Sequence, residues 1–226
     1  MGRPASSEAP LEQQNTFTDS CENRVLIAYS GNFAQEKFFQ SKLEKILSGI
    51  GPFVVISVND RNKLIKHAYS DKILESVDIK GYRRSQIRSL VSKATHAIYF
   101  WDGSHDICEL IYTSTILHKP HRVIAIETTK VANKDRGDEY DVYIGRGSPW
   151  GNPFAIWEDG NDRQLVIDKF AQYFEEEILS NPSKRKALLS LKGKILGCHC
   201  KPFACHGDVI ANYLNSLEDP ESDSEN

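Results

Sequence analysis

The sequence has no long run of apolar residues. No stretch of its 226 residues approaches the roughly twenty apolar side chains that a membrane-spanning helix needs. Residues 1–20 also lack the apolar centre of a secretory signal peptide. We therefore expect a cytoplasmic protein with no membrane partner.

The chain also lacks a surplus of positive charge. It carries 28 Lys and Arg against 31 Asp and Glu, a net charge of −3. Such a chain has no general field that attracts nucleic acid, so phosphate groups must be bound by local loops. The composition argues for a small-molecule nucleotide and against nucleic acid as the partner, and it leaves a homo-oligomer open.

Cysteine is scarce, and its spacing does not suit a disulfide framework. Three of the five cysteines, Cys198, Cys200 and Cys205, fall within eight residues. This crowding is more typical of metal or thiol chemistry in a reducing compartment.

Apolar strand-like runs alternate with helical periodicities through residues 23–128. Strands that are apolar on both faces, separated by helices, are typical of a parallel sheet covered on both sides. We predict a Rossmann-like α/β domain with strands over 24–29, 53–58, 97–101 and 122–126, and with helices near 39–47, 82–93 and 108–117.

The character of the sequence changes after residue 128. Residues 129–139 are polar and charged, which predicts a linker, and residues 140–217 predict a second, small α+β domain. Its expected strands are 141–144 and 194–197, and its last helix is 209–217. The ends of the chain, 1–22 and 218–226, are too polar to offset the entropy of ordering and predict disordered tails.

The loop after the first strand is a candidate ligand site. Ser30, Gly31 and Asn32 follow a strand end and precede a helix, where open α/β sheets bind anionic ligands through backbone amides. The alternative is structural, with Gly31 making a turn and Ser30 capping the next helix. The pattern leaves both interpretations open.

Residues 24–126, which open with VLIAYSGN and close with AIYFWDGSHD and HRVIAI, resemble the YspA-like branch of the SLOG superfamily. This resemblance implies a Rossmann-like nucleotide-binding domain related to the LOG enzymes, which cleave N-glycosidic bonds of nucleotides. The PGGxGT loop of those enzymes does not occur in this chain.

Two motifs in the second half resemble a domain of unknown function that is common in bacteriophage genomes. They are residues 143–154 (YIGRGSPWGNPF) and residues 197–208 (GCHCKPFACHGD). The resemblance carries no activity with it. It implies a phage-type protein, whose compartment would be the cytoplasm of the bacterial host.

The first motif predicts a substrate-binding loop. Arg146 follows a strand end, where a guanidinium beside backbone amides suits a phosphate group. We expect Trp150 to stack on a base and Asn152 to bind a ribose hydroxyl or base edge, with Ser148 in the same loop. Alternatively, Trp150 packs the core and Asn152 holds the loop.

The second motif admits three interpretations. His206 and Asp208 suit an acid/base pair, with the nearby Cys205 thiol activated by the amino end of the last helix. Cysteines are also commonly buried for packing, which suits Cys198 and Cys200. Third, the three thiols and His206 supply four zinc ligands, although adjacent Cys205 and His206 are hard to aim at one ion. We expect no cofactor, with this zinc site as the alternative.

These observations lead to a first hypothesis and two rivals. The first is a nucleotide-processing protein that cleaves or transfers at an N-glycosidic bond, with His206, Asp208 and Cys205 as catalytic residues. The second is a non-catalytic nucleotide sensor or sponge. The third is a zinc-dependent nucleic-acid-binding module, against which the negative net charge stands.

Overall fold

The computed structural model describes residues 23–156 and 162–218. The predicted tail 1–22 lies outside these residues, as does the predicted tail 218–226 apart from Glu218. Within the described ranges, every helix is too short or too polar to cross a membrane.

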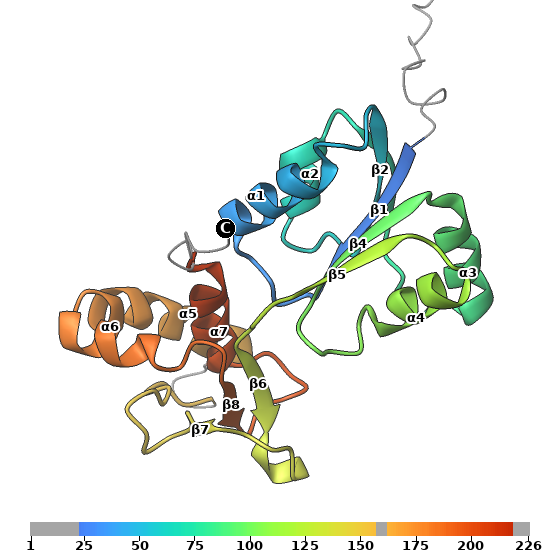
Figure 1. Cartoon of the computed structure of the whole chain (residues 1–226). Helices are drawn as coiled ribbons and strands as arrows, with labels where there is room; N and C mark the ends of the chain where they lie inside the picture. The colour runs from blue at the N-terminus through green and yellow to red at the C-terminus, as the bar shows by residue number, and fades with distance from the viewer. Residues whose placement is uncertain (1–22, 157–161, 219–226) are drawn as a thin grey trace, which may run out of the picture.

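The first part of the chain forms a five-stranded parallel sheet in the order β3-β2-β1-β4-β5 (Figure 1). This arrangement confirms the predicted Rossmann-like α/β fold. The strands are β1 (Asn23–Tyr29), β2 (Phe53–Val58), β3 (Ile73–Val77), β4 (His96–Trp101) and β5 (His121–Ala125), and the helices are α1 (Glu36–Leu47), α2 (Leu64–Tyr69), α3 (Arg84–Lys93) and α4 (Cys108–Ile116).

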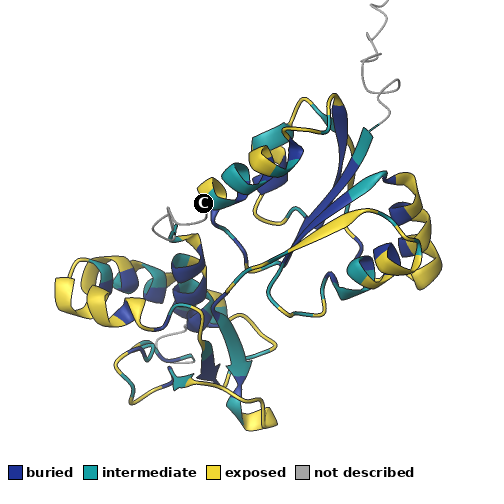
Figure 2. Ribbon diagram, in the orientation of Figure 1, coloured by how far each residue is buried: buried dark blue, intermediate teal, exposed yellow. Residues whose placement is uncertain are grey.

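Two apolar cores lie on opposite faces of this sheet. Successive side chains of a strand point to opposite faces, so Val25 and Ile27 join the core under α1 and α2. Leu26 and Ala28 join the core under α3 and α4. The inner strands are buried on both faces, as Figure 2 shows, and are apolar along most of their length, with Ser57 as a buried polar residue in β2.

The sequence pattern predicts no strand between residues 59 and 81, yet β3 forms there. β3 is an edge strand with alternating half-buried and exposed residues, and Glu75 and Ser76 interrupt its apolar pattern. Pairing with β2 makes this segment a strand, which its composition alone does not indicate.

The second part of the chain is built on a three-stranded parallel sheet in the order β6-β8-β7. Its strands are β6 (Lys130–Asn133), β7 (Val142–Tyr143) and β8 (Ile195–Cys198). A core of residues from the sheet and the surrounding helices lies beside it. The helices are the 3-10 turn η1 (Lys134–Arg136), α5 (Arg163–Tyr173), the π-helix η2 (Phe174–Leu179), α6 (Pro182–Leu189) and α7 (His206–Ser216).

β6 lies inside residues 129–139, so the prediction of a linker is wrong for this strand. Its four residues, KVAN, are too few and too polar to give a strand pattern. They become a strand because they pair in register with β8, from Lys130 opposite Ile195 to Asn133 opposite Cys198.

Polar contacts fix the segment between the two sheets. The buried side chain of Asn215 accepts a hydrogen bond from Thr129 N at 2.7 Å and donates one to Thr129 O at 3.0 Å. Lys130 reaches back to Asp102 at the end of β4, with its Nζ 3.1 Å from the carboxylate. The segment that enters β6 is therefore fixed by α7 of the second domain and by the end of β4 in the first.

Glu218 joins the end of α7 to the start of α1. Its carboxylate accepts hydrogen bonds from Lys37 N at 2.8 Å and Phe38 N at 3.1 Å. The α1 N-cap residue, Gln35, makes no capping hydrogen bond with its own side chain. The predicted disorder is therefore wrong for Glu218. Its carboxylate caps the amino end of α1, where the side chain of Gln35 does not.

Candidate functional site

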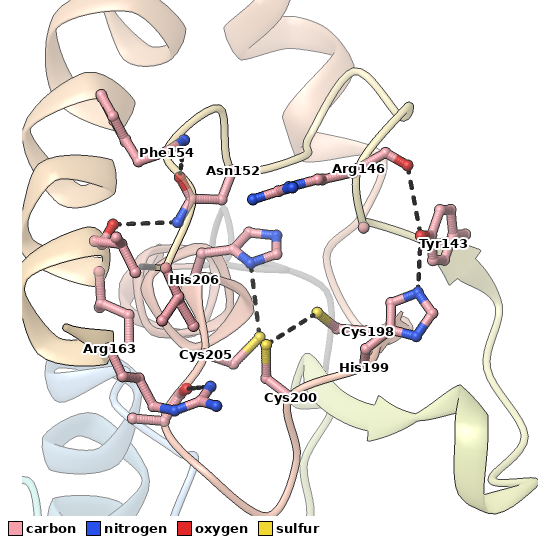
Figure 3. A pocket seen from close by; sticks show the side chains of 15 residues that line it. Tyr143, Arg146, Asn152, Phe154, Arg163, Cys198, His199, Cys200, Cys205 and His206 are labelled. Carbon is pink, nitrogen blue, oxygen red and sulfur yellow. Dashed lines mark hydrogen bonds between the residues drawn. The ribbon is translucent and has the colours of Figure 1, made fainter. Parts of the chain in front are cut away.

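A cavity of about 280 Å³ lies in the second domain, where β7 and β8 end (Figure 3). Parallel strands bring their carboxyl ends to one edge of the sheet, so the loops that follow β7 and β8 meet there. The loop after β7 leads to α5, and the loop after β8 leads to α7. The described lining residues are Tyr143, Gly145, Arg146, Asn152, Phe154, Ile156, Arg163, Val166, Ile167, Cys198, His199, Cys200, Ala204, Cys205 and His206.

The cavity brings together four of the predicted binding and catalytic residues, Arg146, Asn152, Cys205 and His206. It also includes Cys198 and Cys200 of the alternative zinc site. It does not include Ser148, Trp150 or Asp208 among its described lining residues. The loop of Ser30, Gly31 and Asn32 belongs to the other domain, after β1. The predicted residues therefore fall at two separate places.

Arg146 is exposed, and its guanidinium points across the cavity toward Asn152 in Figure 3. Its guanidinium makes no hydrogen bond or ion pair within the described part of the chain, and its backbone oxygen accepts from the Tyr143 hydroxyl at 3.5 Å. Its backbone is held by contact with Gly151: a Cβ at Gly151 would lie 2.8 Å from Gly145 O and 3.1 Å from Arg146 Cα. Only glycine allows the loop to close here, and this closure positions Arg146.

Asn152 holds the loop rather than offering a free amide. Its side-chain amide donates to Val166 O at 3.1 Å, and its carbonyl accepts from Phe154 N at 2.9 Å. Both ends of the side chain are committed, as the structural alternative expects.

Trp150 is 9% exposed and belongs to the core of the second domain. Its backbone N–H donates to Ser148 Oγ at 3.3 Å. The structure therefore places Trp150 where it cannot stack on a ligand, because an indole has enough apolar area to join the core of so small a domain. The half-buried ring of Phe154 faces the cavity in its place.

Arg163 is a cavity residue that the motifs do not include. It is the first residue of α5; its Nη1 donates to Ala204 O at 3.3 Å, and its guanidinium lies 5.3 Å from the centre of the Phe203 ring. It also interacts with the Cys200 sulfur. A basic residue at the start of a helix that faces a cysteine motif is a weak signal, which sequence alone cannot separate from an ordinary surface arginine.

The three cysteine sulfurs converge at the base of the cavity. Their Sγ atoms all lie within 4.8 Å of one another, and those of Cys198 and Cys200 are 3.8 Å apart. Hydrogen bonds from the other two thiols, together with Arg163, hold the pKa of Cys200 well below its ordinary value. The same hydrogen bonds raise the pKa of Cys205, and the bond to Cys200 raises the pKa of Cys198. The pKa of each thiol therefore depends on the protonation of the other two.

His206 is 6% exposed and is fixed on both sides. Its Nε2 lies 2.9 Å from Ile144 O, an acceptor, so this nitrogen carries the proton. Its Nδ1 lies 3.7 Å from Cys205 Sγ. Burial lowers the pKa of His206, which favours the neutral ring.

Asp208 serves the helix terminus and does not hydrogen-bond to the imidazole of His206. Its carboxylate accepts from Cys205 N at 3.0 Å, as part of the cap of α7, and pairs with Lys201 Nζ at 2.5 Å. His206 and Asp208 therefore do not form the hydrogen-bonded pair that an acid/base role would use. Ile144 O orients the ring instead.

A second histidine, absent from the predicted site, lies at the rim of the cavity. His199 Nδ1 is 2.7 Å from Asp135 Oδ2, and its Nε2 is 3.0 Å from the Tyr143 hydroxyl. The carboxylate requires the proton on Nδ1. The Tyr143 hydroxyl, beside Nε2, is also a donor to Arg146 O at 3.5 Å. Asp135 comes from the segment predicted as a linker, so no local motif connects it to His199.

In the loop after β1, a carboxylate of the protein itself occupies the backbone amide that an anionic ligand would use. Gly31 N donates to Asp106 Oδ2 at 2.7 Å, and the buried Ser30 Oγ accepts from Asp102 N and Ser104 Oγ, both at 3.2 Å. Asn32 is exposed beside them. A phosphate at this loop would have to displace Asp106 and lie close to Asp102.

Sequence models of two families match the chain in succession. The minimal SLOG domain matches residues 22–132, and a domain of unknown function (DUF4326) matches residues 128–216. The chain is also similar to the uncharacterized 12.4 kDa protein in the nrdA-td intergenic region of Enterobacteria phage T4, with 41% identity over 88 residues, which are 39% of this chain and 79% of that protein. No solved structure matches.

The predicted resemblances to the SLOG superfamily and to a domain of unknown function are thereby confirmed. The SLOG match relates the first domain to a nucleotide-associated superfamily. The T4 relative supports the predicted phage connection. The chain belongs to the minimal SLOG family in its first domain and to the DUF4326 family in its second.

Proposed function

We propose that the protein binds a nucleotide in the cavity of its second domain. The observation that carries this proposal is the character of the lining: two arginines and two histidines, with no carboxylate among the described residues. The volume of about 280 Å³ is close to the lower end of the range for small-molecule sites.

Arg146 is the residue that would hold the phosphate. Its guanidinium has no partner within the described residues, and its planar fork matches two phosphate oxygens. The apolar side chains of Phe154, Ile156 and Val166 offer a surface for a sugar or base. Arg163 adds a second positive charge at the wall formed by α5.

The first domain belongs to a nucleotide-related superfamily, but its loop after β1 is a less suitable phosphate site than the cavity of the second domain. Gly31 N already donates to Asp106, and the buried carboxylate of Asp102 lies nearby. Two carboxylates repel a phosphate, so we place the ligand in the second domain.

Titration calorimetry with nucleoside phosphates, ADP-ribose and NAD, each beside its phosphate-free nucleoside, tests this proposal. A charge-assisted hydrogen bond contributes about 1.5–3 kcal/mol, so Arg146→Gln should weaken nucleotide binding by about ten- to hundredfold. Arg185→Gln is the matched control, because Arg185 is exposed on α6 in the same domain and away from the cavity.

Two results would overturn the assignment. One is the absence of binding by every nucleotide in the panel. The other is equal loss of affinity in Arg146→Gln and Arg185→Gln, which would indicate only a general charge effect.

The chain of Asp135, His199 and Tyr143 favours a second candidate function, hydrolysis of the N-glycosidic bond of the bound nucleotide. In this reaction, with Nε2 of His199 unprotonated, water adds to the anomeric carbon and its proton passes through Tyr143 to His199. The bond to the base breaks, and the base leaves with the bonding electron pair and takes up a proton from the solvent, while His199 releases its own. Chromatography of the same incubations should then reveal free base with wild-type protein and none with His199→Asn. Nucleotide binding without base release would leave the binding function and eliminate hydrolysis.

A further inference from the structure

The cysteine cluster has a spacing that a disulfide does not explain, and Cys198 and Cys205 lie in the core of the second domain. Cys198 ends β8, Cys200 follows two residues later, and Cys205 is the N-cap of α7. A disulfide requires sulfurs about 2.05 Å apart. The Cys198 and Cys200 sulfurs lie 3.8 Å apart, and all three are free thiols within 4.8 Å of one another.

This spacing fits the edge of a metal-centred tetrahedron. With zinc–sulfur bonds of about 2.3 Å, two sulfurs of a tetrahedral site lie about 3.8 Å apart. With a zinc–nitrogen bond of about 2.0–2.1 Å, a sulfur and a histidine nitrogen lie about 3.6 Å apart. The observed distance from Cys205 Sγ to His206 Nδ1 is 3.7 Å.

The hydrogen bonding of His206 has the form found around metal-bound imidazoles. Its Nε2–H donates to Ile144 O, which leaves the Nδ1 lone pair on the side of Cys205. A metal-bound histidine is normally oriented by donation from its other nitrogen to a carbonyl or carboxylate. The edge contact with Phe170, whose ring centre lies 5.0 Å away, further limits rotation of the imidazole.

The start of α7 explains how two adjacent residues can face one ion. Cys205 has extended backbone angles, φ −140° and ψ 146°, whereas His206 is already the first helical residue. The change of direction between them places His206 Nδ1 beside the Cys205 sulfur (Figure 3). Two adjacent residues are hard to aim at one metal ion in a regular strand or helix. The backbone change at the start of α7 makes this possible for Cys205 and His206.

The surroundings also suit a cluster of thiolates. Gly207 N donates to Cys205 Sγ at 3.3 Å, at the positive amino end of α7. Three thiolates, a neutral imidazole and Zn²⁺ together carry one negative charge. Arg163, which interacts with Cys200, supplies a positive charge beside it.

We propose that Cys198, Cys200 and Cys205 bind a zinc ion that holds the β8–α7 junction and the floor of the cavity. His206 Nδ1 lies beside Cys205 but outside the 4.8 Å cluster of the three sulfurs, and it completes the site by moving toward the ion when zinc binds. The inference is independent of the proposed nucleotide function. Because metal binding to a preformed set of ligands stabilises the fold, this zinc would be structural.

Elemental analysis of the full-length protein, expressed with zinc and purified by gel filtration, is the first test. We expect about one zinc per chain in the wild type. Cys198→Ser and Cys205→Ser should each reduce this to less than about a tenth. Cys108→Ser is the control, since Cys108 lies at the start of α4 in the other domain.

A cobalt titration covers the case in which these variants fail to fold. Metal-free wild-type protein should bind Co²⁺ with the intense d–d bands of a tetrahedral site and with thiolate charge-transfer bands. His206→Asn should retain the charge-transfer bands, shift the d–d bands and weaken cobalt binding at least about tenfold.

Three results would contradict the proposal. A wild type that lacks zinc and whose folded metal-free form gives no cobalt spectrum would eliminate the site. Cysteine variants with full zinc content would do the same. An unchanged cobalt spectrum and affinity in His206→Asn would eliminate His206 as the fourth ligand.

Discussion

The absence of a side chain at Gly151 shapes the loop that carries Arg146. Gly151→Ala would place a Cβ 2.8 Å from a backbone oxygen and 3.1 Å from a backbone carbon, neither of which can turn aside as a side chain could. We expect a loss of about 1–3 kcal/mol in the free energy of unfolding. Urea denaturation measures it.

Gly49→Ala provides the control for this substitution. A Cβ at Gly49 would meet no atom within 4 Å, and its backbone is not left-handed. Equal stability of the Gly151→Ala and Gly49→Ala proteins would contradict the close approach of the loop.

For individual residues, the sequence indicates which side chains are candidates for a site, but not which way they point. It grouped Cys198, Cys200, Cys205 and His206 as zinc ligands, yet gave this interpretation less weight than packing or acid/base chemistry. The hydrogen bond from His206 to Ile144, which supports the proposed zinc site, joins residues 62 positions apart in the chain. No local spacing reports it.

Among the secondary-structure elements, α7 positions the segment that enters β6. The two hydrogen bonds between Asn215 and Thr129 are buried, so loss of the side chain leaves a backbone N–H and a carbonyl without partners. Asn215→Ala should cost about 1–3 kcal/mol in the free energy of unfolding. Thermal or urea unfolding tests this expectation.

Asn212→Ala is the matched substitution on the same helix. Asn212 is exposed, and alanine has the better helix propensity, so the free energy of unfolding should stay within about 0.5 kcal/mol. A comparable loss in both variants would indicate a general weakening of α7 instead.

The paired strands and helices also show where sequence patterns fail. β1, β2 and β4 were predictable because burial on both faces requires largely apolar runs. β3 and β6 carry polar residues and depend on their neighbours. The helix from α5 into η2 places Val166, Phe170, Phe174 and Ile178 in the core at intervals of four residues. In an α-helix this spacing drifts by about 40° per step, which explains a wider π-helical turn.

For the molecule as a whole, acid should weaken the connection between the sheets. The side chain of Asp102 is 2% exposed. Burial alone would raise its pKa, but hydrogen bonds from Ser104, Thr128 and Ser30 outweigh burial and hold the pKa below its ordinary value. Because the unfolded carboxyl has the higher pKa, Asp102 stabilises the fold above that value, and this contribution is lost as the pH falls below about 5.

Asp102→Asn tests this connection. At neutral pH it should lower the free energy of unfolding by about 2 kcal/mol, since Lys130 and Thr128 lose their charged partner. The difference from wild type should shrink as the pH falls toward about 3. Urea denaturation across this pH range measures both effects. Asp78→Asn, at an exposed position after β3, should change neither.

Sequence predicted two domains but expected ligand residues in both of them. The structure separates these residues, because β1 and β7 end in different sheets. A residue list cannot distinguish a shared site from two separate ones, since that depends on how the sheets are joined at β6. The Rossmann-like fold itself followed from local patterns.

The contact between Glu218 and α1 bears on how the chain can evolve. A helix start normally requires Ser, Thr, Asp or Asn at its own cap, but α1 receives a carboxylate from the far end of the sequence. The cap of α1 thereby depends on position 218 instead of on a capping side chain at position 35. Relatives with a strong capping residue at position 35 are free to vary position 218, so the two should covary although 183 positions separate them.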